Sequence, residues 1–443
     1  MMHKPSGDLQ RTLGFRDLVL LAVGTVIGSG IYLVPSVVLR ETGAQTGPAM
    51  LVWIAAGVLS LLGALTYAEL GAMKPEAGGL YAFIRDAFGP VWAFLFGWTS
   101  FFVIASGSVA ALAVAFAGYL SQIVPMGTIA SRLVAVAVIA FTALINVRGT
   151  KGSARLQNWT TGAKVLALLA MGIGLIVFGH APQGGVAGMW PSSVTPSLLT
   201  GFGTAMIAVL WAYEGWQYVT FSAGEALDPQ RTFPRAITAA TVTLIVTYVL
   251  ASYGYIVALG PQAAAHTDHI AADAMTATFG PLVGKLVGVL ILVSIFSATN
   301  GLMLTAPRLY FAMARDGVFF KRLAIVDSRF GTPAFAIAAT AVWAALLAIS
   351  GTFEQLLTYV VFTGWIFYGL GGLAVLRLRR TDPDAIRPFR VPGYPITPLL
   401  FVASAALLVG NTVFTQPTRA LAGLAVMLIG TPAFYLWRGR GRV

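Results

Sequence analysis

The chain has 443 residues, of which 57% are hydrophobic and only 10% are charged, and its mean hydropathy is +0.81. A soluble domain cannot hide so much apolar surface with so few charges, and the absence of cysteine excludes disulfides, thiolate metal sites and thiol nucleophiles. Long unbroken apolar runs, instead of short alternating ones, indicate an all-α polytopic membrane protein and not a β-barrel.

Apolar runs long enough to cross a bilayer recur along the whole chain. An α-helix needs about 20 residues to cross a hydrocarbon core ~30 Å thick. We expect twelve spans, at roughly 17–39, 47–71, 90–118, 132–147, 156–179, 198–224, 235–259, 282–307, 333–350, 355–376, 395–413 and 420–437. An even number places both termini on the same side of the membrane.

The basic residues predict which side that is. Of the 28 lysines and arginines, only Arg40, Arg132, Lys285 and Arg419 fall in segments opposite the termini, and Lys164 falls inside a span. All the others lie on the side of the termini, including Lys4, Arg11, Arg16, Arg308, Arg438, Arg440 and Arg442. The positive-inside rule therefore predicts cytoplasmic termini, and the net charge of +12 is a sign of topology and not of nucleic-acid binding.

The first expected span contains the stretch GTVIGSGIYLVP, residues 24–35, with glycines at 24, 28 and 30. A glycine in a helix interior costs about 1 kcal/mol relative to alanine, so this stretch predicts an interruption of the helix. Close helix packing through Gly24 and Gly28 is the competing interpretation, because small residues at this spacing are common at membrane helix contacts.

The sixth span contains a second irregular stretch, VLWAYEGWQYV, residues 209–219. The two stretches begin spans 1–5 and spans 6–10, and interruptions in corresponding helices of two halves indicate an inverted repeat with a midplane site. Because five is odd, the second set of five spans must enter the membrane from the opposite side.

A broken helix supplies both donors and acceptors for a zwitterion. The half-helix after the break presents free N–H groups and a partial positive charge, here from Gly28, Ser29, Gly30 and Ile31. The half-helix before it ends in free carbonyls, at positions 26 and 27. A carboxylate and an ammonium a few ångströms apart match this pair of poles, so the sequence predicts that Val26, Ile27 and the following residues bind an α-amino acid.

Glu214 lies near the middle of the sixth span, flanked by Trp211 and Tyr213, which we include among the candidate substrate-binding residues. An ionised carboxylate at this depth is costly, so it must face the protein interior, pair or be protonated. Three roles stay open: a protonated structural glutamate, a partner for a cationic group of the substrate, or a proton carrier.

Lys164 lies about eight residues into the fifth span, roughly 12 Å from its cytoplasmic end. Its ammonium either extends to the membrane surface or points inward. In the second case it would neutralise the carbonyl end of the first half-helix, as a bound sodium ion would.

Several motifs together resemble the amino acid–polyamine–organocation (APC) superfamily, and within it the bacterial relatives of the L-type amino acid transporters. The resemblance extends over nearly the whole chain. It rests on GTVIGSGIYLVP (24–35), YAELGAMKPEAGGLYAFIRDAFG (67–89), LQNWTTGAKVLALL (156–169), WAYEGWQYVTFSAGEALDPQRTFPRAI (211–237), RLYFAMARDGVF (308–319) and RPFRVPGYPITPLLF (387–401).

This resemblance implies a five-plus-five inverted repeat, the LeuT-like fold, with discontinuous helices 1 and 6 and two additional C-terminal helices. We expect a single transport domain, with one repeat at about 15–180, the other at about 197–377, and the last two helices at about 395–438.

The resemblance also implies roles for individual residues. Backbone groups of residues 28–30 would bind the substrate carboxylate, and the carbonyls of Val26, Trp211 and Glu214 its ammonium, with Trp211 as an aromatic gate. Lys164 would stand where related transporters bind sodium, and Ser294 and Ser297 would lie near it; together with Glu214 these form the expected coupling residues.

The resemblance implies sodium-independent transport of L-amino acids by alternating access, and we expect exchange of small neutral ones. Many L-type relatives have a small residue at the position of Glu214, so the alternative is proton-coupled symport, or exchange of cationic amino acids or polyamines. The chain is expected to need no cofactor or metal, to bind no nucleic acid, and to lie in the inner membrane of a prokaryote. The eukaryotic members join a heavy subunit through a cysteine, which this chain lacks; its oligomeric state is not determined by the sequence.

Two function classes compete with transport: an intramembrane enzyme and an amino-acid sensor. An intramembrane enzyme would need a catalytic dyad or metal cluster, and the expected spans contain no histidine or cysteine. A sensor that binds an amino acid without moving it stays open, although we find no appended signalling domain.

Overall fold

The structure, a computed structural model, describes residues 9–180, 189–351 and 353–440, without the side chains of 353–355, 357, 358 and 438–440. Of the basic residues used to predict the topology, Lys4 and Arg442 lie outside the described residues, and the side chains of Arg438 and Arg440 are not described.

The described chain is all-helical apart from one isolated bridge between Leu13 and Ala226. Its elements are α1 (Phe15–Val26), α2 (Gly30–Glu41), α3 (Thr46–Met73), α4 (Leu80–Phe88), α5 (Pro90–Thr99), η1 (Ser100–Ile104), α6 (Ala105–Ile123), α7 (Thr128–Val147), α8 (Thr150–Phe178), α9 (Pro196–Ala212), η2 (Trp216–Glu225), α10 (Pro229–Leu259), α11 (Pro261–His266), α12 (Ile270–Phe279), α13 (Pro281–Arg315), η3 (Lys321–Ala324), α14 (Ala334–Ser350), α15 (Phe353–Thr381), α16 (Ile396–Thr415) and α17 (Pro417–Arg440).

The helices confirm the prediction of a polytopic membrane protein. Within the described ranges ten helical stretches are long and apolar enough to cross a membrane, and the pair α1 and α2, bent by 49° at its break, makes eleven. The helix expected as the ninth span, α14, has 17 residues, about 26 Å, so the count of twelve stays a prediction. Large apolar side chains such as Leu166, Leu407 and Phe414 are exposed on the outside of the bundle, where a bilayer would cover them.

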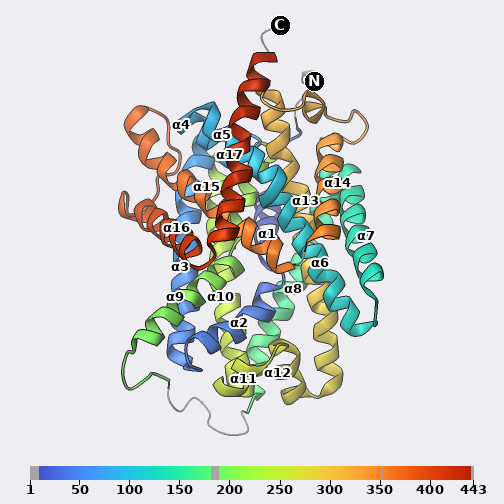
Figure 1. The fold of residues 1–443 in the computed structure, drawn as a ribbon, viewed down its shortest axis with the longest axis vertical. Helices are drawn as coiled ribbons and strands as arrows, with labels where there is room; N and C mark the ends of the chain where they lie inside the picture. Colours follow the sequence, from blue (N-terminus) through green and yellow to red (C-terminus); the bar gives the residue numbers. More distant parts are fainter. Residues whose placement is uncertain (1–8, 181–188, 352, 441–443) are drawn as a thin grey trace.

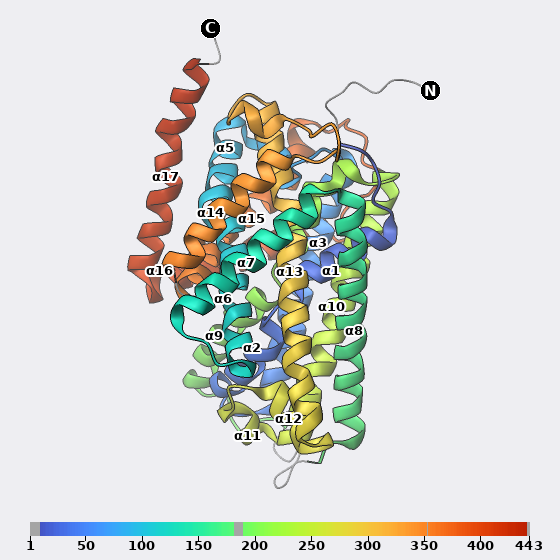
Figure 2. The ribbon, with the colours of Figure 1, turned by 90° about the vertical axis from the view of Figure 1, so that its right-hand side faces the viewer.

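The helices form one elongated bundle with the two ends of the chain at the same end of the molecule (Figure 1). The short helices α11 and α12 lie at the opposite end, and α17 stands at the edge of the bundle (Figure 2). Near the centre, α1 packs against α8, α10 and α13. It also contacts η2, so the first interrupted stretch (α1 and α2) lies beside the second (α9 and η2).

The end of the bundle that holds the termini is closed by buried polar contacts. The backbone N–H groups of Thr12 and Leu13 donate to the carbonyl of Glu225 at 2.8 and 3.0 Å. The Glu225 carboxylate in turn accepts from Arg308 Nε at 2.6 Å, and Arg308 Nη2 donates to Thr150 Oγ1 at 2.9 Å. Arg308 was expected in an aqueous connection, but α13 extends to Arg315, so this arginine lies inside the helix and is fully buried.

Candidate functional site

The first interruption separates α1 from α2 and confirms the predicted break in the first span. Ile27 adopts an extended backbone conformation, with φ −71° and ψ 90°, and α2 begins at Gly30 after Ser29. The Ser29 hydroxyl is buried and has no hydrogen-bond partner among the described residues. The N-terminus of α2 therefore starts in the middle of the bundle, with its N–H groups directed along the helix axis.

The second interruption follows α9. The helix ends at Ala212, a turn covers residues 213–215, and the 3₁₀-helix η2 begins at Trp216. Gly215 has φ +130°, a conformation that a side chain would strain. A Cβ atom placed on Gly215 would lie 3.1 Å from the Thr25 carbonyl oxygen, and one on Gly30 would lie 3.0 Å from Ala212 Cβ. The two breaks therefore face each other directly.

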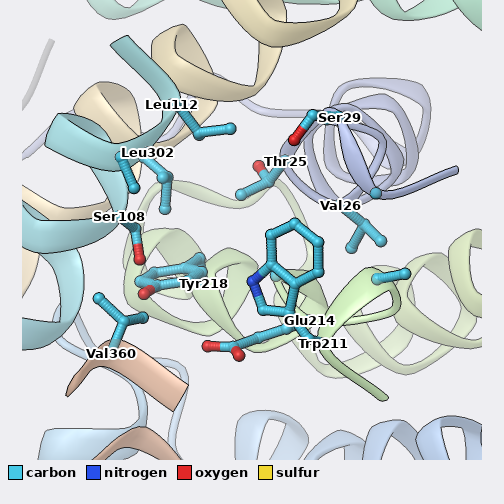
Figure 3. A pocket seen from close by; sticks show the side chains of 15 residues that line it. Thr25, Val26, Ser29, Ser108, Leu112, Trp211, Glu214, Tyr218, Leu302 and Val360 are labelled. Carbon is cyan, nitrogen blue, oxygen red and sulfur yellow. The ribbon is translucent and has the colours of Figure 1, made fainter. Parts of the chain in front are cut away.

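A small cavity of about 70 Å³ lies at this junction (Figure 3). Six of the predicted residues line it: Val26, Gly28, Ser29, Gly30, Trp211 and Glu214. Drug-sized ligand pockets are typically ~300–1,000 Å³, so this cavity suits only a small ligand in the state that the structure describes.

Glu214 is the charged residue of the cavity wall. Its Oε1 accepts a hydrogen bond from the Tyr368 hydroxyl at 2.9 Å, and its Oε2 has no hydrogen-bond partner among the described residues. Figure 3 shows the carboxylate beside the indole of Trp211, across the cavity from Ser29. The lining includes no lysine or arginine, so a positive counter-charge could reach this carboxylate only from a ligand.

Lys164 on α8 points into the bundle and not to the membrane surface. It is fully buried, and its Nζ donates to the carbonyls of Gly24 at 2.7 Å and Ile27 at 2.6 Å. A third, longer contact of 3.4 Å reaches the carbonyl of Ser294. The ammonium thus satisfies the carbonyls that end α1, whose negative pole it faces.

The two serines expected near Lys164 have different surroundings. Ser294 Oγ donates to the carbonyls of Ile27 at 3.0 Å and Gly28 at 3.2 Å, so it belongs to the same cluster as the lysine. Ser297 instead contacts Thr160 Oγ1 at 3.0 Å and Thr161 Oγ1 at 3.4 Å. Only Ser294 touches the break in the first span.

Three candidate substrate-binding residues do not line the cavity: Ile27, Ile31 and Tyr213. The Ile27 carbonyl is occupied by Lys164 and Ser294. The Tyr213 ring is fully buried against Tyr248, with ring centroids 5.0 Å apart. Ile31 lies on α2, where adjacent residues point in different directions, whereas Ile27 and Tyr213 lie in the breaks themselves, where the sequence pattern does not predict the direction of a side chain.

Sequence reasoning missed the rest of the wall. Some of it comes from the two interrupted stretches themselves: Thr25, Ala212, Gly215 and Tyr218. The remainder comes from α6, α13 and α15: Ser108, Ala111, Leu112, Leu302 and Val360. Figure 3 places Ser108, Tyr218 and Val360 opposite Thr25 and Ser29. One local feature accompanies Ser108, because the π-helix η1 ends at Ile104, shortly before it. Such π-helical turns are frequent at functional sites, but the sequence pattern does not reveal one.

Comparison with known proteins agrees with this architecture. The family "Amino acid permease" matches residues 13–434. The chain is 30% identical over 444 residues to the serine/threonine exchanger SteT of Bacillus subtilis, with 98% of each chain covered. It is 31% identical to human b(0,+)-type amino acid transporter 1, covering 97% of this chain and 88% of the relative. It is also 31% identical to human large neutral amino acids transporter small subunit 2, covering 97% and 80%.

These relatives are transporters and not enzymes, and the match covers nearly the whole chain. The chain is therefore a member of the amino acid permease family, within the APC superfamily.

Proposed function

We propose that this protein exchanges small neutral L-amino acids across a prokaryotic inner membrane by alternating access, without sodium. The observation that carries the proposal is the cavity enclosed between the two helix breaks, which brings backbone donors and acceptors to one small volume. Because it is a family member, its broad class is amino-acid transport. The assignment of substrate size and of sodium independence rests on the geometry of the cavity and of Lys164.

The substrate carboxylate is assigned to the N-terminus of α2. Gly28, Ser29 and Gly30 all line the cavity there, and a helix N-terminus attracts an anion. The Ser29 hydroxyl, which has no partner among the described residues, adds a donor at the same place.

The substrate ammonium is assigned to carbonyl oxygens on the opposite side of the break. Within the described ranges, the carbonyl of Val26 receives a long contact of 3.4 Å from the Tyr248 hydroxyl. The carbonyls of Trp211 and Glu214 belong to the turn that ends α9, where the Trp211 carbonyl also accepts from the Glu214 backbone N–H at 2.9 Å, and the indole of Trp211 covers the cavity. The Ile27 carbonyl is left out of this set, because Ile27 does not line the cavity and its carbonyl accepts from both Lys164 and Ser294.

The role of Lys164 supports sodium independence. A sodium ion bound here would need the carbonyl oxygens at the end of α1, and the ammonium already donates to two of them. A fixed positive charge at this place would make a bound sodium ion unnecessary. This assignment includes Ser294 as a neighbour and excludes Ser297.

Glu214 favours a second candidate function: transport of cationic amino acids or polyamines, or coupling to protons. Its Oε2 has no partner among the described residues, and no basic side chain lines the cavity. A substrate with a second positive group would pair with this carboxylate, whereas a neutral substrate would require the carboxyl group to be protonated.

The orientation of the protein in the membrane is proposed from the distribution of its basic residues. Cytoplasmic termini place the Arg308–Glu225 pair at the inner end and α12 at the outer end. The first repeat then covers about 15–180 and the second about 197–377, each beginning with its interrupted span. Residues of about 395–438 form the two additional helices.

The proposal is tested with purified protein in liposomes in sodium-free buffer. Exchange predicts that uptake of radiolabelled L-serine requires unlabelled L-serine inside the vesicles and changes little with a pH gradient. Concentrative uptake into empty vesicles driven by inward protons would favour symport. Binding of L-serine and other L-amino acids without any flux would contradict transport and favour a sensor. Competition by L-lysine, L-ornithine and putrescine distinguishes the cationic alternative.

A further inference from the structure

The motif at residues 67–89, which begins near the end of α3, contributes no residue to the wall of the central cavity. Two of its polar side chains, Tyr67 and Glu69, are nevertheless fully buried where α3 contacts α15. A buried polar group is costly unless it has a hydrogen-bond partner, so the partners of these two side chains indicate what they do.

Tyr67 bridges the two elements that carry Glu214 and its partner. The Tyr67 hydroxyl donates to the backbone carbonyl of Tyr368 on α15 at 2.9 Å. Its ring packs edge-on against Trp216, the first residue of η2, with ring centroids 5.2 Å apart. Gly371 makes room for this arrangement, because a Cβ atom there would overlap the Tyr67 hydroxyl. Tyr67 therefore holds α15 beside the second break.

Glu69 fastens the same two helices at a second point. Its carboxylate accepts from Arg379 Nε at 2.8 Å and Nη2 at 2.6 Å, and from the backbone N–H of Val391 at 2.7 Å. Arg379 lies three turns after Tyr368 on α15, about 16 Å along the helix. Two attachments on one face leave α15 little freedom to rotate about its axis, so the direction of the Tyr368 side chain is set from α3.

The direction of the Tyr368 side chain matters because of what its hydroxyl binds. This hydroxyl donates to Glu214 Oε1 at 2.9 Å, whereas Glu214 Oε2 has no hydrogen-bond partner in the described part of the chain. Hydrogen bonds to ionised groups are roughly twice as strong as those between neutral groups. The bond from Tyr368 therefore supports an ionised carboxylate with one oxygen held in place and the other free to meet a positive group.

We propose that Tyr67 is a positioning residue for substrate selectivity: by holding the Tyr368 backbone, it keeps the Tyr368 hydroxyl on Glu214 and so favours substrates with a second positive group. The inference rests on the second candidate function, in which Glu214 pairs with a cationic substrate. Tyr67 lies outside the cavity wall, so it acts on the substrate through α15 and not by contact.

The test measures the ratio of the inhibition constants of L-lysine and L-alanine against exchange of radiolabelled L-serine in liposomes. The proteins are the wild type, Y67F, Y368F and the double variant Y67F/Y368F. Y67F keeps the ring against Trp216 and removes only the hydroxyl that binds α15. A ratio of constants does not depend on the amount of folded protein, so a general loss of stability leaves it unchanged.

The matched control is Y255F. Tyr255 is also fully buried, does not line the cavity, and has a hydroxyl without a hydrogen-bond partner among the described residues. We expect Y67F to raise the L-lysine constant relative to that of L-alanine about three- to tenfold, and Y368F by at least as much. The double variant should shift no further than Y368F, because the effect of Tyr67 passes through the Tyr368 hydroxyl. Y255F should keep the wild-type ratio.

Three outcomes would overturn the inference. A Y67F ratio equal to that of Y255F would show that Tyr67 only packs α3 against α15, while the proposed exchange would stand. Shifts of Y67F and Y368F that multiply in the double variant would contradict a path through Tyr368. Wild-type exchange that L-lysine does not inhibit would overturn the cationic candidate function together with this inference.

Discussion

Two ionisable side chains, Lys164 and Glu214, lie at the helix breaks, and they differ in how completely the surrounding residues satisfy their hydrogen-bonding groups. Lys164 is fully buried and donates to two carbonyls at 2.6 and 2.7 Å, so the protein satisfies its charge locally. In the part of the chain that the structure describes, the Glu214 carboxylate accepts a hydrogen bond from Tyr368 on one oxygen and has no partner on the other. A satisfied charge suits a permanent structural or conformational role, whereas an unsatisfied one suits a group that changes its partner during transport.

Replacing Lys164 tests the first role. K164A leaves the carbonyls of Gly24 and Ile27 without their donor, and each unsatisfied buried group costs about 1–3 kcal/mol. We expect exchange in liposomes to fall at least about tenfold, with a lower melting temperature of the detergent-solubilised protein. The control is K151A, on the exposed surface of the same helix. Exchange by K164A at the K151A rate would exclude a conformational role for this lysine.

Replacing Glu214 tests the second role. E214Q keeps a hydrogen-bond acceptor for Tyr368 but removes the negative charge. If cationic substrates bind here, the variant loses about tenfold or more in L-lysine competition while L-alanine competition changes little. If Glu214 carries protons, the pH dependence of transport between pH 5 and 8 flattens instead. Y368F is the companion variant, because it removes the hydrogen bond and keeps the charge. Unchanged selectivity and an unchanged pH profile in E214Q would leave Glu214 a structural residue.

At the scale of the helix elements, the glycines of the first span occupy two kinds of position: one lies at a close helix contact, and two line the cavity. A Cβ atom on Gly24 would lie 2.1 Å from Thr161 Oγ1 and 2.2 Å from Gln157 Nε2, so this glycine allows α1 to pack closely on α8. Gly28 and Gly30 instead line the cavity. Close packing, one of the two competing interpretations of the sequence motif, therefore belongs to Gly24, whereas the residues of the proposed substrate site are Gly28 and Gly30.

This division predicts the effect of a small substitution. G24A inserts a methyl group where no space exists, and overpacking typically costs about 1–3 kcal/mol. We expect a lower melting temperature and reduced exchange. The control is G162A on α8, where no atom lies within 4 Å of the added methyl group. A melting temperature of G24A equal to that of G162A would contradict the close contact between α1 and α8.

At the scale of the whole molecule, the end that holds the termini is closed by a buried ion pair. Arg308 and Glu225 have side chains 1% and 2% exposed, and their nearest atoms are 2.6 Å apart. The pair links α13 to η2, and the backbone of Glu225 also binds the segment before α1. Opening this end for release of substrate would separate these elements, so the pair should stabilise the closed state that the structure shows.

Removing one partner of this pair leaves the other charge buried and unpaired. We expect R308M and E225M each to destabilise the protein by about 3–5 kcal/mol, and the double variant R308M/E225M to be less destabilised than either single variant. Thermal unfolding in detergent measures this, with R322M, on the exposed helix η3, as the control. Additive losses in the double variant would show that the two charges do not interact.

The sequence by itself predicted the long apolar helices that the structure describes, the two breaks and the family resemblance, while the count of twelve spans stays a prediction. Hydrocarbon tolerates only apolar helices with satisfied backbones, so each span and each exception to it is visible in the order of residues. The ends of the helices were less well predicted, because α8 begins at Thr150 and α13 continues to Arg315 through segments whose basic residues, such as Lys151 and the buried Arg308, resemble those of a connection. The short helices α4, α11 and α12 were missed because, with 9, 6 and 10 residues, they are too short to register as membrane spans.

Only the tertiary structure decided which side chains meet. It placed Lys164 inward instead of at the surface, separated Ser297 from Ser294, and put Tyr213 outside the cavity. It also brought Ser108, Leu302 and Val360 to the cavity wall from three other helices. Hydropathy records how deep a residue lies in the membrane, whereas the direction in which it points depends on the rotation and packing of whole helices, which no local pattern fixes.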